Sequence, residues 1–426
     1  MKFTLPEDAF PAVNLSKEQQ QALINEAEAV VRETLAANET FLGEGSKFPS
    51  SQWRLVRAKD GLTVYRERRA SGNSRTLGKQ ERSGSISPMS QSESWSTDPS
   101  TLGDRCRAGA EASTSSSFAP ATNKLMQRPV MILHGTVDGS LDDCMFGTFA
   151  STDEAWKWRS SHINDRLDDA RILATLRKPT EEDPFQFLGI KWFAKERPAV
   201  VSSIMQQRDY LIMEATGLTR DSKGERIGYY LMHSISIPGV PELTELGIIR
   251  AKLSLCFIDR QKGPGKVEKY CRNYSDPGGK IVDRVAVAVG AEAIIGASRV
   301  VDYAYVKKLT WLMKHKGEPQ RESRREAGLP RPKRCETCFK SFSKFALTAS
   351  ALGGSCQICR QVICAKCSVF KKMTDDVSST GAVEQVALRF CLNCLMEAKE
   401  QSVWDMALTG VETASETSSA SGSGYR

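Results

Sequence analysis

The alternation of apolar and polar residues predicts a chain that begins with an amphipathic helix and continues as a series of strands. Residues 15–37 place apolar side chains at helical spacing behind a capping box formed by Ser16 and Gln19. Residues 52–66 predict two strands joined at the hairpin dipeptide Asp60-Gly61. Further strands are predicted over 130–139, 199–215, 227–237, 248–258 and 266–274, with a short helix over 141–149.

A long helix is predicted over residues 282–314, after the turn formed by residues 275–279. Its apolar stripe consists largely of valine and alanine, and such small residues allow close approach to another surface. The order of helix, antiparallel strands and long helix predicts an α+β fold in which a curved sheet surrounds a helix.

Three segments have compositions that do not predict packed structure. Residues 71–120 contain 14 serines and few large apolar residues, so we expect a disordered insertion over 68–128. Residues 317–334 are basic and contain glycine and proline, which favours a linker. The Ser/Gly-rich residues 412–426 are expected to be a disordered tail.

The overall composition is that of a soluble globular protein of 426 residues, with 40% hydrophobic and 26% charged residues. No run of 18 uncharged apolar residues occurs, so no transmembrane helix is expected. The first residues lack a basic segment followed by an apolar one, which argues against a secretory signal. We therefore expect a cytoplasmic protein.

The formal net charge of +8 has a local origin. Residues 331–372 contain nine Lys or Arg and one Glu, whereas the remaining basic and acidic side chains balance. This short segment is the part of the chain that most needs an anionic partner.

The cysteines give the most specific chemical pattern in the sequence. Eight of the 12 cysteines form four C-x-x-C pairs between residues 335 and 394, and none of the four histidines lies in that segment. Two thiolates three positions apart can face one ion, and Zn²⁺ takes four such ligands tetrahedrally. Four disulfides are the alternative, which the absence of a secretory signal disfavours. The pairs are Cys335/Cys338, Cys356/Cys359, Cys364/Cys367 and Cys391/Cys394.

Several ordered segments together resemble a START domain, the lipid-transfer fold known as helix-grip. The matching residues are Trp53 with 60–66 (DGLTVYR), 208–210 (RDY), 234–254, 274–281 (YSDPGGKI) and the long terminal helix. The resemblance covers roughly residues 15–316, interrupted by the Ser-rich insertion, and the implied domain comprises residues 1–67 and 129–316. It implies an antiparallel sheet wrapped around the C-terminal helix and an apolar tunnel that holds one lipid, although the same apolar residues could fill a solid core.

Two arginines are candidates to bind a lipid head group in such a tunnel. Arg208 and Arg250 lie in the segments that carry the resemblance. A buried arginine can hold a phosphate or a hydroxyl group, but Arg208 could equally form a structural ion pair with Asp209.

Residues 335–400 resemble a FYVE zinc finger, through 335–342 (CETCFKSF), 356–368 (CQICRQVICAKCS) and 389–394 (RFCLNC). The resemblance implies a cross-brace with two structural Zn²⁺ ions. One ion would be bound by Cys335, Cys338, Cys364 and Cys367, and the other by Cys356, Cys359, Cys391 and Cys394.

The match to the FYVE family is incomplete where that family binds phosphoinositides. The basic segment expected before the third cysteine is replaced by residues 352–355 (LGGS), and only Arg389 remains of the basic pocket. We therefore expect weak or no specific phosphoinositide recognition. A basic face with apolar tips could still hold an anionic membrane such as that of endosomes, or the same residues could simply pack and solvate a small core. The membrane-facing candidates are Lys340, Lys344, Phe345, Arg360 and Arg389.

These features together predict a non-catalytic lipid-binding or lipid-transfer protein with a zinc module for membrane or protein docking. The alternative is an interaction adaptor in which the lipid cavity is vestigial and the zinc module, FYVE-like or RING-like, recruits a protein. An enzyme is disfavoured because no nucleophile and base are recognisable, and four thiolates leave a zinc ion no open position for water. Nucleic-acid binding is disfavoured because base-stacking motifs are absent.

Overall fold

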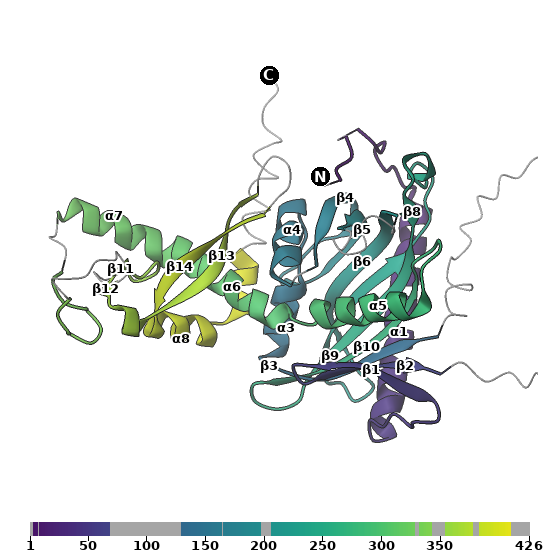
Figure 1. Cartoon of the computed structure of the whole chain (residues 1–426), viewed down its shortest axis with the longest axis horizontal. Coiled ribbons are helices and arrows are strands. Elements are labelled where there is room, and N and C mark those ends of the chain that lie inside the picture. Colours follow the sequence, from purple (N-terminus) through teal and green to yellow (C-terminus); the bar gives the residue numbers. More distant parts are fainter. Residues whose placement is uncertain are drawn as a thin grey trace, which may run out of the picture. The chain divides into compact units, whose positions relative to one another are not determined.

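The computed structural model describes residues 3–6, 8–68, 129–163, 165–196, 206–328, 332–342, 354–377 and 383–409 (Figure 1). All of these residues belong to one compact unit. The insertion expected over 68–128 lies outside the described residues from residue 69 onward, and so does the tail expected over 412–426.

A large antiparallel sheet dominates the described chain. Ten strands take part, in the order β1-β2-β3-β10-β9-β7-β6-β5-β4, with β8 paired in parallel to β6. The glycine Gly61, with φ +79°, turns the hairpin between β1 and β2 as the sequence predicted. The strands are β1 (Trp53–Lys59), β2 (Leu62–Glu67), β3 (Met131–Asp138), β4 (Leu167–Arg177), β5 (Phe187–Lys195), β6 (Arg208–Arg220), β7 (Arg226–Ser234), β8 (Ile249–Arg250), β9 (Lys252–Gln261) and β10 (Lys266–Asp276).

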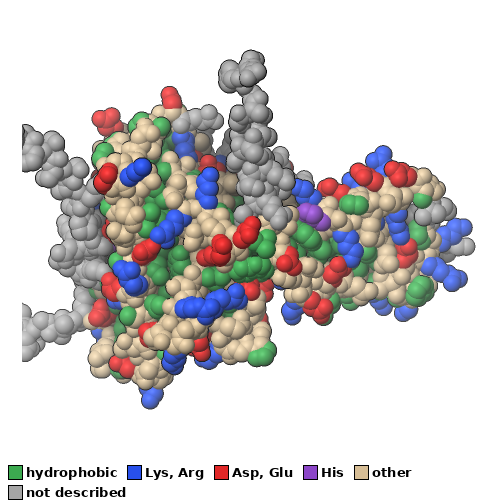
Figure 2. Space-filling view, turned by 180° about the vertical axis from the view of Figure 1, so that it is seen from behind, with side chains coloured by type: hydrophobic (Ala, Val, Ile, Leu, Met, Phe, Trp, Pro, Cys, Tyr) green, Lys and Arg blue, Asp and Glu red, His purple; other side chains and the backbone are tan. Residues whose placement is uncertain are grey.

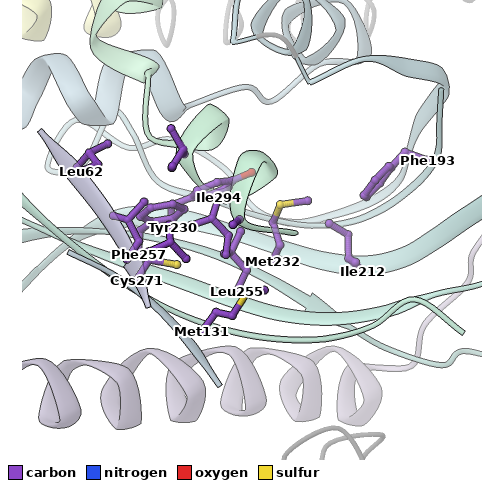
Figure 3. Close-up of a cluster of buried hydrophobic side chains, with 14 of the residues drawn as sticks. Leu62, Met131, Phe193, Ile212, Tyr230, Met232, Leu255, Phe257, Cys271 and Ile294 are labelled. Atoms are coloured by element: carbon purple, nitrogen blue, oxygen red, sulfur yellow. The ribbon is translucent and has the colours of Figure 1, made fainter. Parts of the chain in front are cut away.

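Helices cover both faces of this sheet. Helix α1 (Lys17–Gly43) begins at the Ser16/Gln19 capping box and packs its apolar side on one face, through Leu23, Ala27 and Phe41. Helix α5 (Asp283–Ala297) lies on the other face, and Figure 3 shows the buried side chains between it and the strands. The core on this side includes Phe193, Met232, Leu255, Phe257 and Ile294. The predicted α+β class, with an antiparallel sheet around a helix, is confirmed.

The long helix predicted over 282–314 is interrupted. Helix α5 ends at Ala297, and helix α6 (Val300–Leu312) starts after a turn at Ser298 and Arg299. The turn lets Val300 pack closely on α3 (Leu141–Thr148), where a side chain at Gly147 would collide with the Val300 carbonyl oxygen. Because sequence periodicity is the same on both sides of Ser298, this tertiary contact was not visible in it.

Helical structure continues beyond α6 into the segment expected to be a linker. A π-helical turn, η3 (Met313–Gly317), follows α6 and leads directly into α7 (Glu318–Glu326). The helix α4 (Asp153–His162) and the strands β4 and β5 were not predicted from the sequence.

The cysteine-rich segment contains short strands β11 (Gly354–Ser355) and β12 (Val362–Ile363), and the short helix η4 (Ala365–Cys367). A longer hairpin of β13 (Ser368–Val377) and β14 (Val383–Cys391) leads into α8 (Leu392–Glu400). Residues 403–409 are helical, and Val403, Met406 and Ala407 return to pack against Leu141 and Met145 of α3.

Two features of the described residues concern membranes. No helix in the described ranges is long and apolar enough to cross a bilayer. On the face drawn in Figure 2, acidic and basic side chains are interspersed with hydrophobic ones.

Candidate functional site

The eight cysteines of the C-x-x-C pairs gather into two groups of four. Cys335, Cys338, Cys364 and Cys367 form one group, and Cys356, Cys359, Cys391 and Cys394 form the other. Within each group the four sulfur atoms lie within 4.8 Å of one another. This is the interleaved grouping that the FYVE resemblance implied.

The spacing of the sulfur atoms fits a tetrahedral metal site. Four sulfurs at about 2.3 Å from one Zn²⁺ ion would lie about 3.8 Å apart. The Sγ atoms of Cys338 and Cys364 are 3.8 Å apart, and so are those of Cys359 and Cys391. A disulfide would require about 2.05 Å, and all the described cysteines are free. The two clusters can therefore each bind a metal ion, and four thiolates are the ligand set that zinc prefers.

Backbone N–H groups stabilise the thiolate form of the first ligand in each cluster. The Sγ of Cys335 accepts from the N–H of Cys364 at 3.3 Å, and the Sγ of Cys356 accepts from the N–H of Cys391 at 3.3 Å. Burial opposes ionisation of Cys335, but the N–H groups of Cys338 and Cys364 outweigh it and lower the pKa of this thiol to about 6.

The clusters are supported by helix α6 and the turn that follows it. Leu309 and Leu312 of α6 belong to the same buried cluster as the metal-site cysteines and Phe390. The Tyr305 hydroxyl donates to the Leu395 carbonyl oxygen at 2.8 Å. Lys316 forms an ion pair of 2.8 Å with Glu397, of which both side chains are about 40% exposed. The helix that the sequence placed at the end of the sheet region thus also forms part of the core of the cysteine-rich segment.

The basic residues proposed to face a membrane have different surroundings. Lys340 is exposed. The Arg360 guanidinium donates to the Gly317 carbonyl oxygen at 2.9 Å and to the Gln357 side chain at 2.7 Å. Lys344 and Phe345 lie outside the described residues.

The guanidinium of Arg389 lies over the Phe370 ring, 5.0 Å from its centroid, and beside Gly354. A Cβ atom at position 354 would approach it to 2.9 Å. Gly354, in the segment where the FYVE family has basic residues, therefore provides the space that the arginine fills.

A cavity of about 150 Å³ lies between the sheet and helix α5. Its wall is mostly apolar, and α5 contributes small residues together with Val289 and Ile294. Val285 and Val289 of α5 are 40% and 48% exposed, and Val282, which precedes the helix, is 67% exposed, so this segment also carries apolar surface to solvent. The described residues that line the cavity are Trp156, Arg159, Ile163, Asp165, Phe193, Lys195, Arg208, Tyr210, Tyr230, Met232, Lys252, Leu253, Leu255, Asn273, Ser275, Pro277, Ile281, Ala286, Val289, Gly290, Ala293, Ile294 and Ala297.

One end of this cavity is basic. Lys195 at the end of β5 pairs with Arg208 at the start of β6, and Lys252 begins β9. Strands β6 and β9 both pair near their starts with the end of β7, at Ile212–Ser234 and Ser254–His233. The antiparallel register therefore brings these three cations to the same end of the sheet. Lys195 forms a 2.6 Å ion pair with Asp165, the one acidic residue among those that line the cavity.

The two arginines proposed as head-group ligands differ in position. Arg208 lines the cavity, and its guanidinium donates to the carbonyl oxygens of Gln206 at 2.9 Å and Pro277 at 2.7 Å. Arg250 is not among the lining residues. It forms a bidentate pair with Asp209, at 2.9 and 2.8 Å, so the ion-pair partner of Asp209 is Arg250.

Sequence reasoning missed a buried charge cluster that reaches the cavity wall through Arg159. Glu214 of β6 accepts from Arg159 of α4 at 3.0 Å and from Lys191 of β5 at 2.8 Å, and all three side chains are at most 3% exposed. Arg159 lines the cavity. Burial outweighs the attraction of Glu214 and lowers the pKa of Lys191 to about 8. In the sequence, the signal of this cluster was that Lys191 and Glu214 each stand within an otherwise apolar run.

Comparison with known proteins gives a distant likeness in structure. No family model and no curated protein matches the sequence. Human STARD10 overlaps with a TM-score of 0.35 at 12% identity, over 65% of this chain and 81% of that protein. Human StAR-related lipid transfer protein 5 gives a TM-score of 0.35 at 12% identity, over 66% and 97%. A Xanthomonas axonopodis STAR-related lipid transfer protein gives 0.32 at 11%, over 59% and 96%. These values are low, and the function of those proteins is not transferred to this chain.

Proposed function

We propose that this chain is a non-catalytic lipid-binding protein in which the cavity beneath α5 holds an apolar chain. The observation that carries this proposal is an apolar cavity with a basic end, formed by Lys195, Arg208 and Lys252. An acyl chain needs only an apolar, water-free space, and an acidic head group needs cations at one end of it.

The cavity is too small to hold a whole lipid in the conformation described. A void of about 150 Å³ is below the range of roughly 300–1,000 Å³ that drug-sized ligands occupy, and is close to one that accepts benzene. A whole lipid therefore requires α5 to move outward from the sheet. Gly278 and Gly279, each with φ +60°, precede α5 and can take up the change in backbone direction.

We further propose that the two cysteine clusters each hold one structural Zn²⁺ ion. Four protein thiolates complete the tetrahedral shell and leave no position for a substrate, so the metal would supply folding energy rather than chemistry. The measurement is metal content per chain, with two equivalents of zinc expected. One equivalent or none would contradict this part of the proposal.

The cysteine-rich segment is proposed to dock on an anionic membrane with little selectivity for one lipid. Phe339 and Phe370 are 73% and 53% exposed, and Lys340 is exposed nearby in the sequence. Arg360 already donates to Gly317 and Gln357, which leaves it fewer donors for a phosphate. We expect weak, salt-sensitive flotation with vesicles containing phosphatidylserine, and little gain when an inositol monophosphate lipid is added. Tight, selective flotation would contradict this assignment.

Native mass spectrometry of the full chain purified from cells tests the lipid proposal. A co-purified amphiphile is expected, and Arg208→Gln should reduce its occupancy several-fold because the basic end loses a donor. Arg220→Gln is the matched control, since Arg220 lies at the other end of β6 and donates to Gly224. A chain that carries two zinc ions and no lipid would favour the alternative function, an adaptor with a vestigial cavity.

A further inference from the structure

A second, larger cavity lies away from the sheet interior. It has a volume of about 350 Å³, and its walls come from α3, α4, α6, η3, β13 and residues 406–409. It is lined by Phe146, Ala155, Trp158, His162, Tyr303, Val306, Lys307, Thr310, Trp311, Lys314, His315, Thr374, Met406 and Thr409. Its volume lies in the range that small ligands occupy.

The side chains of this wall that can be charged near neutral pH are all basic, and burial lowers the pKa of one of them, His162, which favours its neutral form. Lys307, Lys314, His162 and His315 line the cavity, and no acidic residue is among its described lining residues. The π-helical turn that follows α6 carries Lys314 and His315 to the wall, and such turns occur often at functional sites. His162 is held by Thr374 at 2.8 Å, and His315 by the Trp311 carbonyl oxygen at 2.9 Å.

Lys307 has no carboxylate partner in the described chain. Its Nζ donates to the carbonyl oxygens of Phe146 and Phe149, at 2.6 and 3.4 Å, and lies 4.0 Å from the centroid of the Phe146 ring. Burial, with a further effect from Arg159, lowers the pKa of this amine to about 7. The positive charge of this wall therefore comes from Lys314 and from the protonated fraction of Lys307, and an anion bound beside Lys307 would favour its protonated form.

The aromatic part of the wall contains unsatisfied donors. The indole N–H groups of Trp158 and Trp311 are buried without an acceptor among the described residues. A buried donor without an acceptor is costly, so a ligand oxygen that reaches either group after a ring rotation would gain a hydrogen bond at little desolvation cost.

We propose that this cavity is a binding site for a small organic anion, namely a carboxylate or phosphate group on an apolar body. The acidic group would lie near Lys307 and Lys314, and the body would contact Val306 and Met406. The site is separate from the cavity under α5, because its described lining residues are not shared with that cavity.

Four probes separate the contributions of charge and body when they are titrated into the full chain by calorimetry. 1-Naphthoate and 1-naphthyl phosphate combine a body with an acidic group, whereas 1-naphthylmethanol has the body alone and inorganic phosphate the charge alone. We expect both acidic probes to bind at least 10-fold more tightly than either partial probe, and the ratio between them identifies the preferred acid. Equal binding of the alcohol would overturn the proposal.

Variants locate the bound probe. Lys314→Gln and Trp311→Phe should each weaken naphthoate binding about 10-fold, as expected for a lost charge-assisted or indole hydrogen bond. Lys223→Gln, in the exposed turn after β6, and Trp404→Phe, outside the cavity, are the matched controls. Lys314 is exposed, so its variant does not depend on refolding of the core.

Indole N–H resonances of ¹⁵N-tryptophan-labelled protein distinguish the two cavities. Probe binding at the proposed site should shift the signals of Trp158 and Trp311 while that of Trp156, in the cavity under α5, stays in place. Shifts confined to Trp156 would overturn the proposal and assign the probe to the other cavity.

Discussion

Replacing Ala297 by leucine tests whether the space beneath α5 is empty in the absence of ligand. Ala297 lies at the end of α5 and lines the cavity together with Trp156 and Ile163. It is also packed against the main core cluster. A leucine at this position adds three carbon atoms to a side chain that already lines the cavity between α5 and the sheet.

The sign of the stability change depends on whether the space exists. Three carbons moved from water into an empty apolar cavity contribute about 0.8 kcal/mol each, or about 2 kcal/mol together. The same atoms forced into a packed core cost about 1–3 kcal/mol. With a void of about 150 Å³ available, we expect the delipidated variant to be about 1–2 kcal/mol more stable than the delipidated parent protein.

The assay is urea unfolding of both proteins after delipidation, followed by tryptophan fluorescence and circular dichroism. Lipid occupancy of the same two proteins, purified from cells, is then compared by native mass spectrometry. The expected result is higher stability and lower lipid occupancy in Ala297→Leu. A destabilised variant would show that the cavity is already filled by protein, and a stabilised variant with unchanged lipid would place the lipid elsewhere.

Three further predictions concern the metal clusters and the buried charges. Cys391→Ser should remove one zinc equivalent and expose residues 354–400 to proteolysis. The control is Cys256→Ser, because Cys256 is a buried cysteine of β9 outside the clusters, and this variant should keep two zinc equivalents. Protection of residues 354–400 in the absence of zinc would refute this prediction. Glu214→Gln leaves two buried cations with no carboxylate and should destabilise the fold by about 3–5 kcal/mol in urea unfolding, and a loss below about 1 kcal/mol would show that the charges are not buried in solution. Because the folded-state pKa of Lys307 is about 7 and its ordinary value is 10.5, the unfolded chain binds more protons between these values and stability should rise with pH there, by at most about 1.4 kcal/mol per unit. Lys307→Met should remove that part of the slope, and an unchanged slope in urea midpoints at pH 7 and 9 would contradict the assignment.

Local patterns in the sequence were sufficient for several parts of the fold. The capping box at Ser16, the turn at Gly61 and the short apolar runs of β7 and β9 each depend on residues close together in the chain. The strand β4 was missed because its sequence, LDDARILATLR, mixes charged and apolar residues without a period of two, and β5 was missed because Gly189 and Lys191 break its apolar run. The interruption at Ser298 was missed because it is caused by the contact of Val300 with Gly147, which is distant in sequence.

The candidate sites also differ in how far the sequence alone revealed them. The four C-x-x-C pairs identified every cysteine of the two clusters, since the short spacing that lets two thiolates face one ion is itself a feature of the sequence. The sequence suggested Arg208 as the partner of Asp209, because the two are adjacent in the chain. The pair that Asp209 forms with Arg250 instead follows from the parallel register of β6 and β8, which the sequence did not reveal.

The sequence by itself determined the α+β class and the residues capable of binding metal, because both follow from local spacing. Only the tertiary structure decided that Arg159 and Lys191 share Glu214, that α6 supports the cysteine clusters, and that two separate cavities exist. Cavities and buried ion pairs arise where elements far apart in the chain fail to fill space or must neutralise charge, and no local pattern records how those elements meet.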